Sequence, residues 1–446
     1  MLYTLGVLAF AVGLLASIAL HEVGHMVPAK KFGVKVTQYM VGFGPTLWSR
    51  RRGETEYGVK AIPLGGYIRM IGMIPPRQDG TRSRWPRRLA TLAEDFRQSS
   101  RADVTPEDGP REFYRLTPWK KIIVMVGGPS MNLLIYVVLT VLLLGAIGIK
   151  QPTNQVSNVA RCVIPAVPAG ATAPVLPADG SCPAGSRSAP AAAALETGDR
   201  ILAVNGVPMR KWTDTVAVIE RSAGTPLTLR VERAGRNIDV RLTPVRNLKY
   251  ANDTGTRTKE AGFIGIGTTD AYERVAAGAI PGQIGSQFVQ GVDALGRFPA
   301  KVGSLFGTVF EGHPRDAQGA VGVVGLGRMG GEVASARSLG VLDKAYFLLA
   351  LLAGVNLLLF LFNLLPLLPL DGGHVAGAVV EIAKRRRAEW RARRSPVPGQ
   401  AGALRRPIYV DTAQMVPVLY GVAALLLVFT LFVLYADIVD PISLTS

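Results

Sequence analysis

The residues best suited to chemistry in this sequence form one short stretch, His21-Glu22-Val23-Gly24-His25. In a helix, residues four apart share a face, so the two imidazoles could bind one Zn²⁺ together. Glu22 follows the first histidine and could take a proton from a water held by the metal. The chain has 4 histidines, and two of them end an apolar run, where ionisable groups are costly and usually functional. The alternative is a pair of interfacial histidines beside a glutamate that reaches water.

A third ligand is needed, because catalytic zinc usually has three protein ligands and one open position. The stretch Asn363–Gly373 offers one. Its two prolines, three residues apart, must interrupt a helix. Unwinding inside a membrane protein often marks a site, and here it would let Asp371 reach inward. Two alternatives remain: Asp371 could cap a following helix over Val375–Lys384, or His374 could be the third ligand.

These residues must be positioned by membrane helices. The sequence is 48% hydrophobic with a mean hydropathy of +0.26, which indicates an integral membrane protein. Crossing a bilayer takes roughly 20 apolar residues. The runs that approach or exceed this length are Leu2–Leu20, Ile122–Ile149, Tyr346–Leu370 and Val416–Tyr435. The first lacks the basic start and small-residue cleavage site of a signal peptide, so we expect a membrane helix.

The distribution of charge predicts the orientation. The chain has a net charge of +18, which by itself could suggest nucleic acid. Residues 30–121 hold 19 Lys+Arg against 9 Asp+Glu and residues 375–412 hold 9 against 3, whereas residues 150–344 hold 22 against 16. The positive-inside rule places the first two loops in the cytoplasm and the central region outside. We find no nucleic-acid-binding module, and we expect the Lys384–Arg387 cluster to contact anionic lipid.

Two segments flank the first and second membrane helices. Glycine-bounded, strand-like pieces over Val36–Met70 predict β-hairpins beside the membrane. The polar, basic stretch Ile74–Pro118 predicts a flexible cytoplasmic insertion with a short helix, Trp85–Gln98. Early in the second membrane helix, small residues in Gly127–Met131 allow close helix approach, and Asn132 is a polar group that needs a partner.

The central region contains the pattern of a soluble domain. Turn and strand signals are followed by a predicted helix and two paired strands, in the order Leu195–Gly206, Trp212–Arg221, Leu227–Glu232 and Ile238–Leu242. The motif Leu-x-x-Gly-Asp-x-Ile-x-x-Val-Asn-Gly and this order resemble a PDZ domain. PDZ domains hold extended peptide ends by β-augmentation, although the fold could serve here only as a steric cap.

Three further features lie in the outside region. Cys162 and Cys182 could form a disulfide there or stay unpaired. An apolar stripe over Gln283–Phe310, with a break expected at Pro299, predicts an amphipathic helix on the outer membrane surface. Gly319–Gly327 is glycine-rich but lacks the strand–turn–helix context of a dinucleotide site.

Together, these motifs resemble the site-2 protease family of intramembrane zinc metalloproteases, in its bacterial branch similar to the regulator of sigma-E protease. The matching motifs are His-Glu-x-x-His, a Gly-x-Gly hairpin, Gly-Pro-x-x-Asn, the PDZ pattern and Asn-x-x-Pro-x-x-Pro-Leu-Asp-Gly. The sigma-E regulator type has two PDZ domains, whereas one is recognisable here. The single domain and the Arg- and Ala-rich composition look like actinobacterial members.

The resemblance implies a zinc metalloendopeptidase in which His21, His25 and Asp371 hold Zn²⁺ and Glu22 is the general base. It also implies substrate contacts at Asn363, Pro366, Gly42, Phe43, Gly44, Gly65 and Gly66, and we add Asn132. Family substrates are single-pass membrane proteins already trimmed by a site-1 protease, often anti-sigma factors. The main alternative is a catalytically inert membrane PDZ scaffold or substrate-binding adaptor, but metal binding alone does not need Glu22. A zinc transporter would need further intramembrane acids or histidines, which the other apolar runs lack.

We therefore expect an α-helical polytopic protein of the cell membrane. It should have about four transmembrane helices, a membrane-associated β-hairpin region and an inserted extracytoplasmic PDZ domain of the α+β class. The expected segments are 1–73 (first transmembrane helix and hairpin), 74–118 (flexible cytoplasmic insertion), 119–149 (second helix), 150–250 (PDZ domain), 251–344 (extracytoplasmic linker with an amphipathic helix), 345–384 (third helix with the Pro-Asp motif), 385–412 (basic cytoplasmic loop) and 413–446 (fourth helix and tail).

Overall fold

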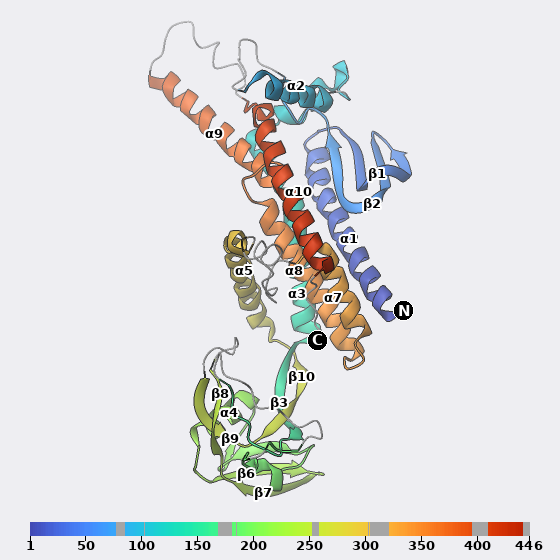
Figure 1. Cartoon of the computed structure of the whole chain (residues 1–446). Coiled ribbons are helices and arrows are strands. Elements are labelled where there is room, and N and C mark those ends of the chain that lie inside the picture. The colour runs from blue at the N-terminus through green and yellow to red at the C-terminus, as the bar shows by residue number, and fades with distance from the viewer. Residues whose placement is uncertain are drawn as a thin grey trace. The chain divides into compact units, whose positions relative to one another are not determined.

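The computed structural model of the chain contains two compact units, which we describe separately (Figure 1). The helical unit comprises residues 1–146 and 276–446, and the β unit comprises residues 147–275. The structure describes residues 1–76, 85–101, 103–167, 181–183, 185–251, 258–301, 303, 321–394 and 409–439.

Among the described residues, four helices are long and apolar enough to cross a membrane, as predicted. They are α1 (Leu2–Lys31), α3 (Pro118–Leu142, continued by a π-helical turn at Leu143–Ile147), α8 (Val341–Asn363) and α10 (Val416–Val439). Many of their large apolar side chains face outward, as bilayer lipid rather than water would allow. The four helices therefore indicate a membrane protein.

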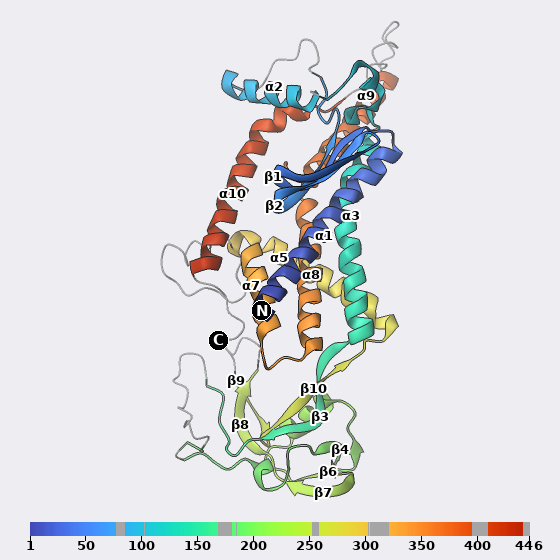
Figure 2. The same ribbon diagram turned by 90° about the vertical axis from the view of Figure 1, so that its right-hand side faces the viewer.

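One helix in the described part of this unit was not predicted. Helix α7 (Val323–Ser335) includes part of the glycine-rich stretch and packs along α1 (Figure 2). A Cβ atom added to Gly6 of α1 would lie 2.5 Å from the carbonyl oxygen of Gly330 and from the Cβ of Ala334. The absence of side chains at Gly6 and Gly330 thus brings the two backbones together, a common form of packing between membrane helices.

The segment expected over residues 345–384 contains two helices, with the interruption at the prolines that the sequence predicts. Helix α8 ends at Asn363, and a separate helix, α9, runs from Asp371 to Arg394. Prolines between them cannot donate the hydrogen bonds that would continue α8. The turn is tight: a Cβ on Gly372 would lie 2.2 Å from the Leu365 carbonyl oxygen. Since α9 continues to Arg394, the first part of the expected basic loop is helical.

The predicted hairpin region is present as β1 (Val36–Arg52) and β2 (Thr55–Met70), an antiparallel pair. Both strands bend, so β1 residues near Met40 pair with two parts of β2, around Gly58 and around Tyr67. Glycines with positive φ at Gly42 (93°) and Gly65 (115°) allow these bends. The C-terminal part of β2, which includes Tyr67, lies against α1, the helix that carries the His-Glu-x-x-His motif.

The described part of the expected flexible insertion at 74–118 contains more secondary structure than predicted, while residues 77–84 and 102 lie outside the described residues. Helix α2 (Arg87–Arg101) begins and ends slightly later than the expected helix, and two 3₁₀ turns follow it, Pro106–Arg111 and Phe113–Arg115. Phe113 is buried in a cluster with residues of α1, β1, β2 and α3, and its backbone N–H bonds to the Ile71 carbonyl. Apolar burial therefore holds the end of this segment in place.

The predicted amphipathic helix is α5 (Ile280–Gly296), which ends three residues before Pro299. Its apolar side packs on α3 and α8 of the same unit: the rings of Phe288 and Phe360 lie 6.1 Å apart. This packing on neighbouring helices replaces part of the surface contact with lipid that we expected. Residues 304–310 of the predicted stripe lie outside the described residues.

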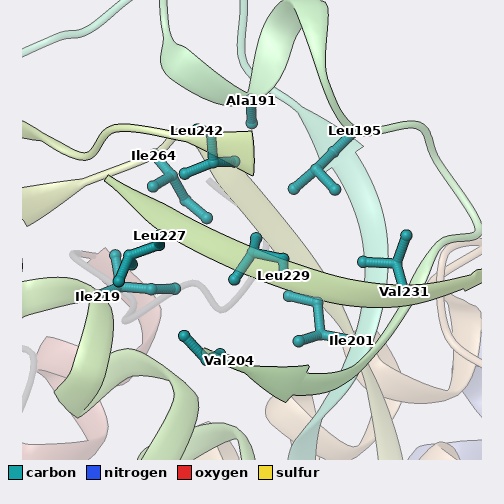
Figure 3. Packing of buried hydrophobic residues seen from close by; sticks show 10 residues of the cluster. All are labelled: Ala191, Leu195, Ile201, Val204, Ile219, Leu227, Leu229, Val231, Leu242 and Ile264. Carbon is teal, nitrogen blue, oxygen red and sulfur yellow. The ribbon is translucent and has the colours of Figure 1, made fainter. Parts of the chain in front are cut away.

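The β unit contains a sheet with the strand order β10-β3-β4-β6-β7, in which β5 also pairs with β4, and a separate β8–β9 hairpin. The elements are β3 (Ile149–Val159), β4 (Arg200–Val204), β5 (Val207–Pro208), α4 (Trp212–Arg221), β6 (Leu227–Arg233), β7 (Arg236–Leu242), β8 (Val245–Tyr250), β9 (Thr258–Phe263) and β10 (Ile266–Glu273). The core gathers apolar side chains of β4, β6, α4 and the segments around them (Figure 3). Because β9 and β10 belong to this unit, the expected boundary at residue 250 falls too early.

A buried ion pair fixes the Gly-Asp turn of the β unit. Asp199 is buried and accepts hydrogen bonds at 2.8 and 2.7 Å from the guanidinium of Arg233 on β6. These bonds hold the pKa of Asp199 below its usual value.

Cys162 and Cys182, which could have stayed unpaired, form a disulfide with an S–S distance of 2.05 Å. Residues 168–180, between the two cysteines, lie outside the described residues.

Candidate metal centre

Helix α1 brings His21 and His25 onto one face, as their spacing predicts. The Nε2 atoms of the two imidazoles lie 3.1 Å apart. Both are in the C-terminal half of α1, and His25 is buried. The local sequence alone therefore produces two of the three ligand positions.

Asp371, from a distant part of the sequence, lies next to these two histidines. As the first residue of α9, directly after the Pro-rich turn, it places Oδ2 3.3 Å from Nε2 of His21 and 3.3 Å from Nε2 of His25. The cap and the ligand interpretations are thus compatible, since Asp371 begins the helix and its carboxylate faces the histidines. His374 lies one turn further along α9, where it lines a small cavity with Lys121 and Glu381.

These three residues fit a zinc ion. Zinc bonds of 2.0–2.1 Å in tetrahedral geometry separate neighbouring ligand atoms by about 3.3 Å, close to the 3.1 and 3.3 Å found here. Two imidazoles and a carboxylate are an ordinary zinc ligand set that leaves a fourth position for water. Asp371 Oδ2 is buried and makes no hydrogen bond to any described residue, so an ion there would supply its missing partner.

The orientation of one histidine is set by α3. His25 donates from Nδ1 to the backbone carbonyl of Val124 at 2.8 Å, because a carbonyl can only accept. The proton is therefore on Nδ1, and Nε2 is left with its lone pair directed at Asp371 and His21. Hydrogen bonds of this kind to a ligating histidine usually tune metal affinity.

Glycines of α3 create the space for the metal ligands. A Cβ atom on Gly128 would lie 2.2 Å from Nε2 of His25 and 2.7 Å from Nε2 of His21. One residue earlier, a Cβ on Gly127 would lie 2.1 Å from the carbonyl oxygen of Gly24, the small residue inside the His-Glu-x-x-His motif. Any side chain at these positions would push α1 and α3 apart. The small residues here were predicted to allow close helix approach, but their position beside the two histidines was not predicted.

Glu22 lies between the metal ligands and β2. A Cβ on Gly66 would be 3.1 Å from Cγ of Glu22, so β2 closely approaches this side chain. Glu22 is thus close to the ligand group without belonging to it. A carboxylate in this position can accept a proton from a water at the open metal position.

The other predicted hairpin residues form the surface of the strand bends. The ring of Phe43 stacks on Tyr67 at 6.1 Å and covers Gly65, whose added Cβ would lie 2.5 Å from it. Phe43 is exposed, whereas Gly42 is buried beneath the Ile62 carbonyl. Gly44 takes a positive φ of 83°. Of this group, only Gly66 directly approaches Glu22.

The remaining predicted site residues are spread over the helices. Asn132 is buried on α3 one turn beyond Gly128, and its Oδ1 has no hydrogen-bond partner among the described residues. Asn363 ends α8, and Pro366 is exposed in the turn before Asp371.

A polar contact between α1 and α8 was not predicted. Asn356 is fully buried and donates from Nδ2 to the hydroxyl of Ser17 at 3.0 Å. Ser17 lies four residues before His21, on the same face of α1. The spacing of Ser17, His21 and His25 is the sequence signal that could have revealed this polar stripe.

The fold and the centre together define a class. Three candidate metal ligands on helices of a membrane protein, with a further carboxylate beside them, are typical of a membrane-embedded metallohydrolase. Comparison with known proteins narrows this class. The profile of Peptidase family M50 matches residues 9–396.

Relatives span the whole chain. Zinc metalloprotease Rip1 of Mycobacterium tuberculosis is 33% identical over 455 residues, covering 100% of both chains. Zinc metalloprotease Rip1 of Mycolicibacterium smegmatis is 32% identical over 462 residues, again covering 100% of both. Metalloprotease MmpA of Caulobacter vibrioides is 26% identical over 399 residues, 84% of this chain and 86% of its own.

The chain therefore belongs to peptidase family M50 and is a zinc metalloprotease. The predicted resemblance to site-2 proteases, the enzyme class and the zinc cofactor are confirmed.

Proposed function

We propose that this chain is an intramembrane protease that cleaves the transmembrane segments of single-pass proteins, such as anti-sigma factors already trimmed by a site-1 protease. The observation that supports this most strongly is the approach of His21, His25 and Asp371 within 3.3 Å on elements of the membrane unit. A hydrolytic centre at this place would meet peptide bonds inside the bilayer.

In this proposal, His21, His25 and Asp371 hold the metal and Glu22 is the general base. Bound zinc would supply a Lewis acid that makes water nucleophilic near neutral pH. Glu22 takes the proton of the attacking water and passes it to the leaving amine. Gly66 has no side chain and so leaves room for Glu22 beside β2.

A substrate helix must unwind before it can be cut, because its carbonyls are tied up in internal hydrogen bonds. We assign the holding of the opened segment to the part of β2 next to Glu22, where backbone pairing could add a substrate strand. The bends at Gly42, Gly44 and Gly65, with Phe43, would shape this surface. Asn132, Asn363 and Pro366 would line the helical side of the cleft.

A cleavage assay tests this function directly. The chain should be co-expressed with a panel of the host's single-pass anti-sigma factors, each shortened to its trimmed form. At least one should be cut inside its apolar segment, as mapped by mass spectrometry of the products. Cleavage should stop with the zinc chelator 1,10-phenanthroline and in His21→Ala, which lacks a ligand. Cuts confined to polar segments would overturn the intramembrane assignment.

We further infer that the β unit is a PDZ-type domain outside the cell that restricts which substrates reach the site. A Cβ on Gly262, at the end of β9, would lie 2.1 Å from the Ile219 carbonyl of α4, so the chain entering β10 runs directly beneath α4. Helix α4 thus packs tightly on β9. The PDZ assignment is supported by the order of the Gly-Asp turn, β4, α4 and the β6–β7 hairpin, which is the order of the motif.

Removing the β unit should therefore relax the need for trimming. Ile149 pairs with Glu273, so entry and exit are adjacent and residues 149–273 can be replaced by a short Gly-Ser linker. Untrimmed substrates with bulky outer domains, which wild type leaves intact, should then be cut; trimmed substrates serve as the control for a working centre. If untrimmed substrates stay resistant while trimmed ones are cut, the β unit does not restrict access to the site.

The predicted orientation has its own test. A cysteine replacing exposed Arg387 on α9 should be protected from an impermeant thiol reagent in intact cells, whereas one replacing exposed Arg236 in the β unit should react. The native cysteines are joined in a disulfide and do not compete. A permeant reagent should label both variants. Labelling of the Arg387 variant alone by the impermeant reagent would reverse the positive-inside assignment.

A further inference from the structure

Helix α9 has two opposite faces with different partners. With 3.6 residues per turn, Asp371, Ala378, Glu381 and Arg385 lie on one side. This side faces the unit: Ala378 and Glu381 are buried, and Glu381 accepts hydrogen bonds from Lys121 of α3 at 2.7 Å and from Arg385 at 2.6 Å. One helix thus carries a proposed metal ligand at its first residue and a buried ion pair nearly three turns later.

The opposite side becomes strongly basic. Lys384, Arg387, Arg391 and Arg394, spaced three, four and three residues apart, share this side, and all four are exposed. We call them the basic face. Within residues 384–394 the sequence has 7 Lys or Arg and 1 acid, Glu389. A helix face with this charge attracts a polyanionic surface.

The Lys121–Glu381 pair shows where this face lies relative to the bilayer. Lys121 is in the first turn of the α3 span, which begins at Pro118, and Glu381 lines a cavity with Thr412, where the α10 span begins. Two membrane spans therefore begin at the level of Glu381. At 1.5 Å per residue, Lys384 and Arg387 follow Glu381 by about 5 and 9 Å along α9. The basic face therefore starts next to the headgroup layer, which is roughly 5–8 Å deep.

An aromatic side chain supports the same location. Trp390 is 52% exposed, and the guanidinium of Arg394 lies 3.7 Å from the centre of its ring. Tryptophan is enriched at membrane–water interfaces because its ring is apolar and its N–H is polar. The C-terminal half of α9 extends away from the other helices of the unit, so the face is open to a surface (Figure 1).

We propose that the basic face binds the headgroups of anionic phospholipids. This lipid site does not depend on the proposed role of Asp371 as a metal ligand. Guanidinium groups pair with lipid phosphates through two parallel hydrogen bonds, and the exposed tryptophan anchors the helix among the headgroups.

The test measures lipid binding without catalysis. Purified full-length protein in dodecyl maltoside is titrated with phosphatidylglycerol or phosphatidylcholine, and bound lipid is counted by native mass spectrometry. Each basic residue near an anionic surface contributes about fivefold in affinity, so Arg387→Gln/Arg391→Gln/Arg394→Gln should bind phosphatidylglycerol roughly a hundredfold more weakly. The triple lysine variant should retain most of the binding, because it keeps the charge.

The controls separate this site from general charge and from the protease. Arg210→Gln/Arg236→Gln/Arg241→Gln removes three exposed charges from the β unit and should bind phosphatidylglycerol like wild type. Glu22→Gln should also bind it fully, so a failure of the proposed enzyme mechanism would leave the lipid result unchanged. Free glycerol phosphate should not displace the lipid. The proposal would be overturned if the glutamine triple variant bound phosphatidylglycerol as tightly as wild type. It would also be overturned if the three arginines bound a polyuridine RNA and no lipid.

Discussion

Glu22→Gln is expected to keep a full complement of zinc and to lose cleavage by about 10²–10⁴-fold, the usual effect of removing a general base. Glutamine keeps the size of the side chain but cannot accept the proton of the attacking water. Glu22 lies beside the ligand group without belonging to it, so metal binding should not change. Zinc content by atomic absorption checks that the metal is kept, and the cleavage rate of the same preparation checks that activity is lost.

Asp371→Asn is the matched comparison for this variant. Its neutral amide is a poorer zinc ligand than a carboxylate, so metal should be lost while the base remains. Added zinc should restore part of its activity and none of that of Glu22→Gln. Substantial cleavage by Glu22→Gln would mean that another residue is the base, and zinc loss in that variant would make Glu22 a ligand.

Gly128→Ala is expected to weaken zinc binding by about a hundredfold, at the upper end of what supporting residues around a metal contribute. The new methyl group would lie 2.2 Å from Nε2 of His25, closer than any contact between non-bonded atoms allows. The backbone has little room to move away, because Gly127 and Gly24 already bring α3 and α1 into contact. Activity should fall in proportion to the metal lost.

The matched control is Gly421→Ala on α10, where an added Cβ meets nothing within 4 Å. This variant makes the same substitution in a membrane helix and should bind zinc and cleave substrate like wild type. Zinc affinity can be measured by competition with a fluorescent chelator. Wild-type affinity in Gly128→Ala would show that the space beside the two histidines is not needed for the metal.

Features that depend on one continuous stretch were predictable from the sequence. The spacing of His21 and His25 determines that they share a face of α1, since the helical repeat is local. The apolar runs determine the four membrane-length helices, and the alternation around Ala234-Gly235 determines the β6–β7 pair. The prolines before Asp371 determine that α8 must stop there.

Other features were decided by contacts between distant segments. Helix α7 was missed because its glycines disfavour an isolated helix, and close packing on α1 through Gly6 and Gly330 outweighs that preference. Phe113 belongs to a segment whose composition suggested flexibility, yet burial of its ring against α1 and α3 makes that segment ordered.

The metal centre shows the same division. Its residue types and the α1 pair were determined by the sequence, but the approach of Asp371 to 3.3 Å required the tight turn at Gly372 and the packing of α9 on α3. Gly128 has no side chain to suggest a role, and its importance appears only when α1 and α3 are in contact. Periodicity along one helix is a property of consecutive residues, whereas the distance between two helices depends on which side chains are absent where they cross.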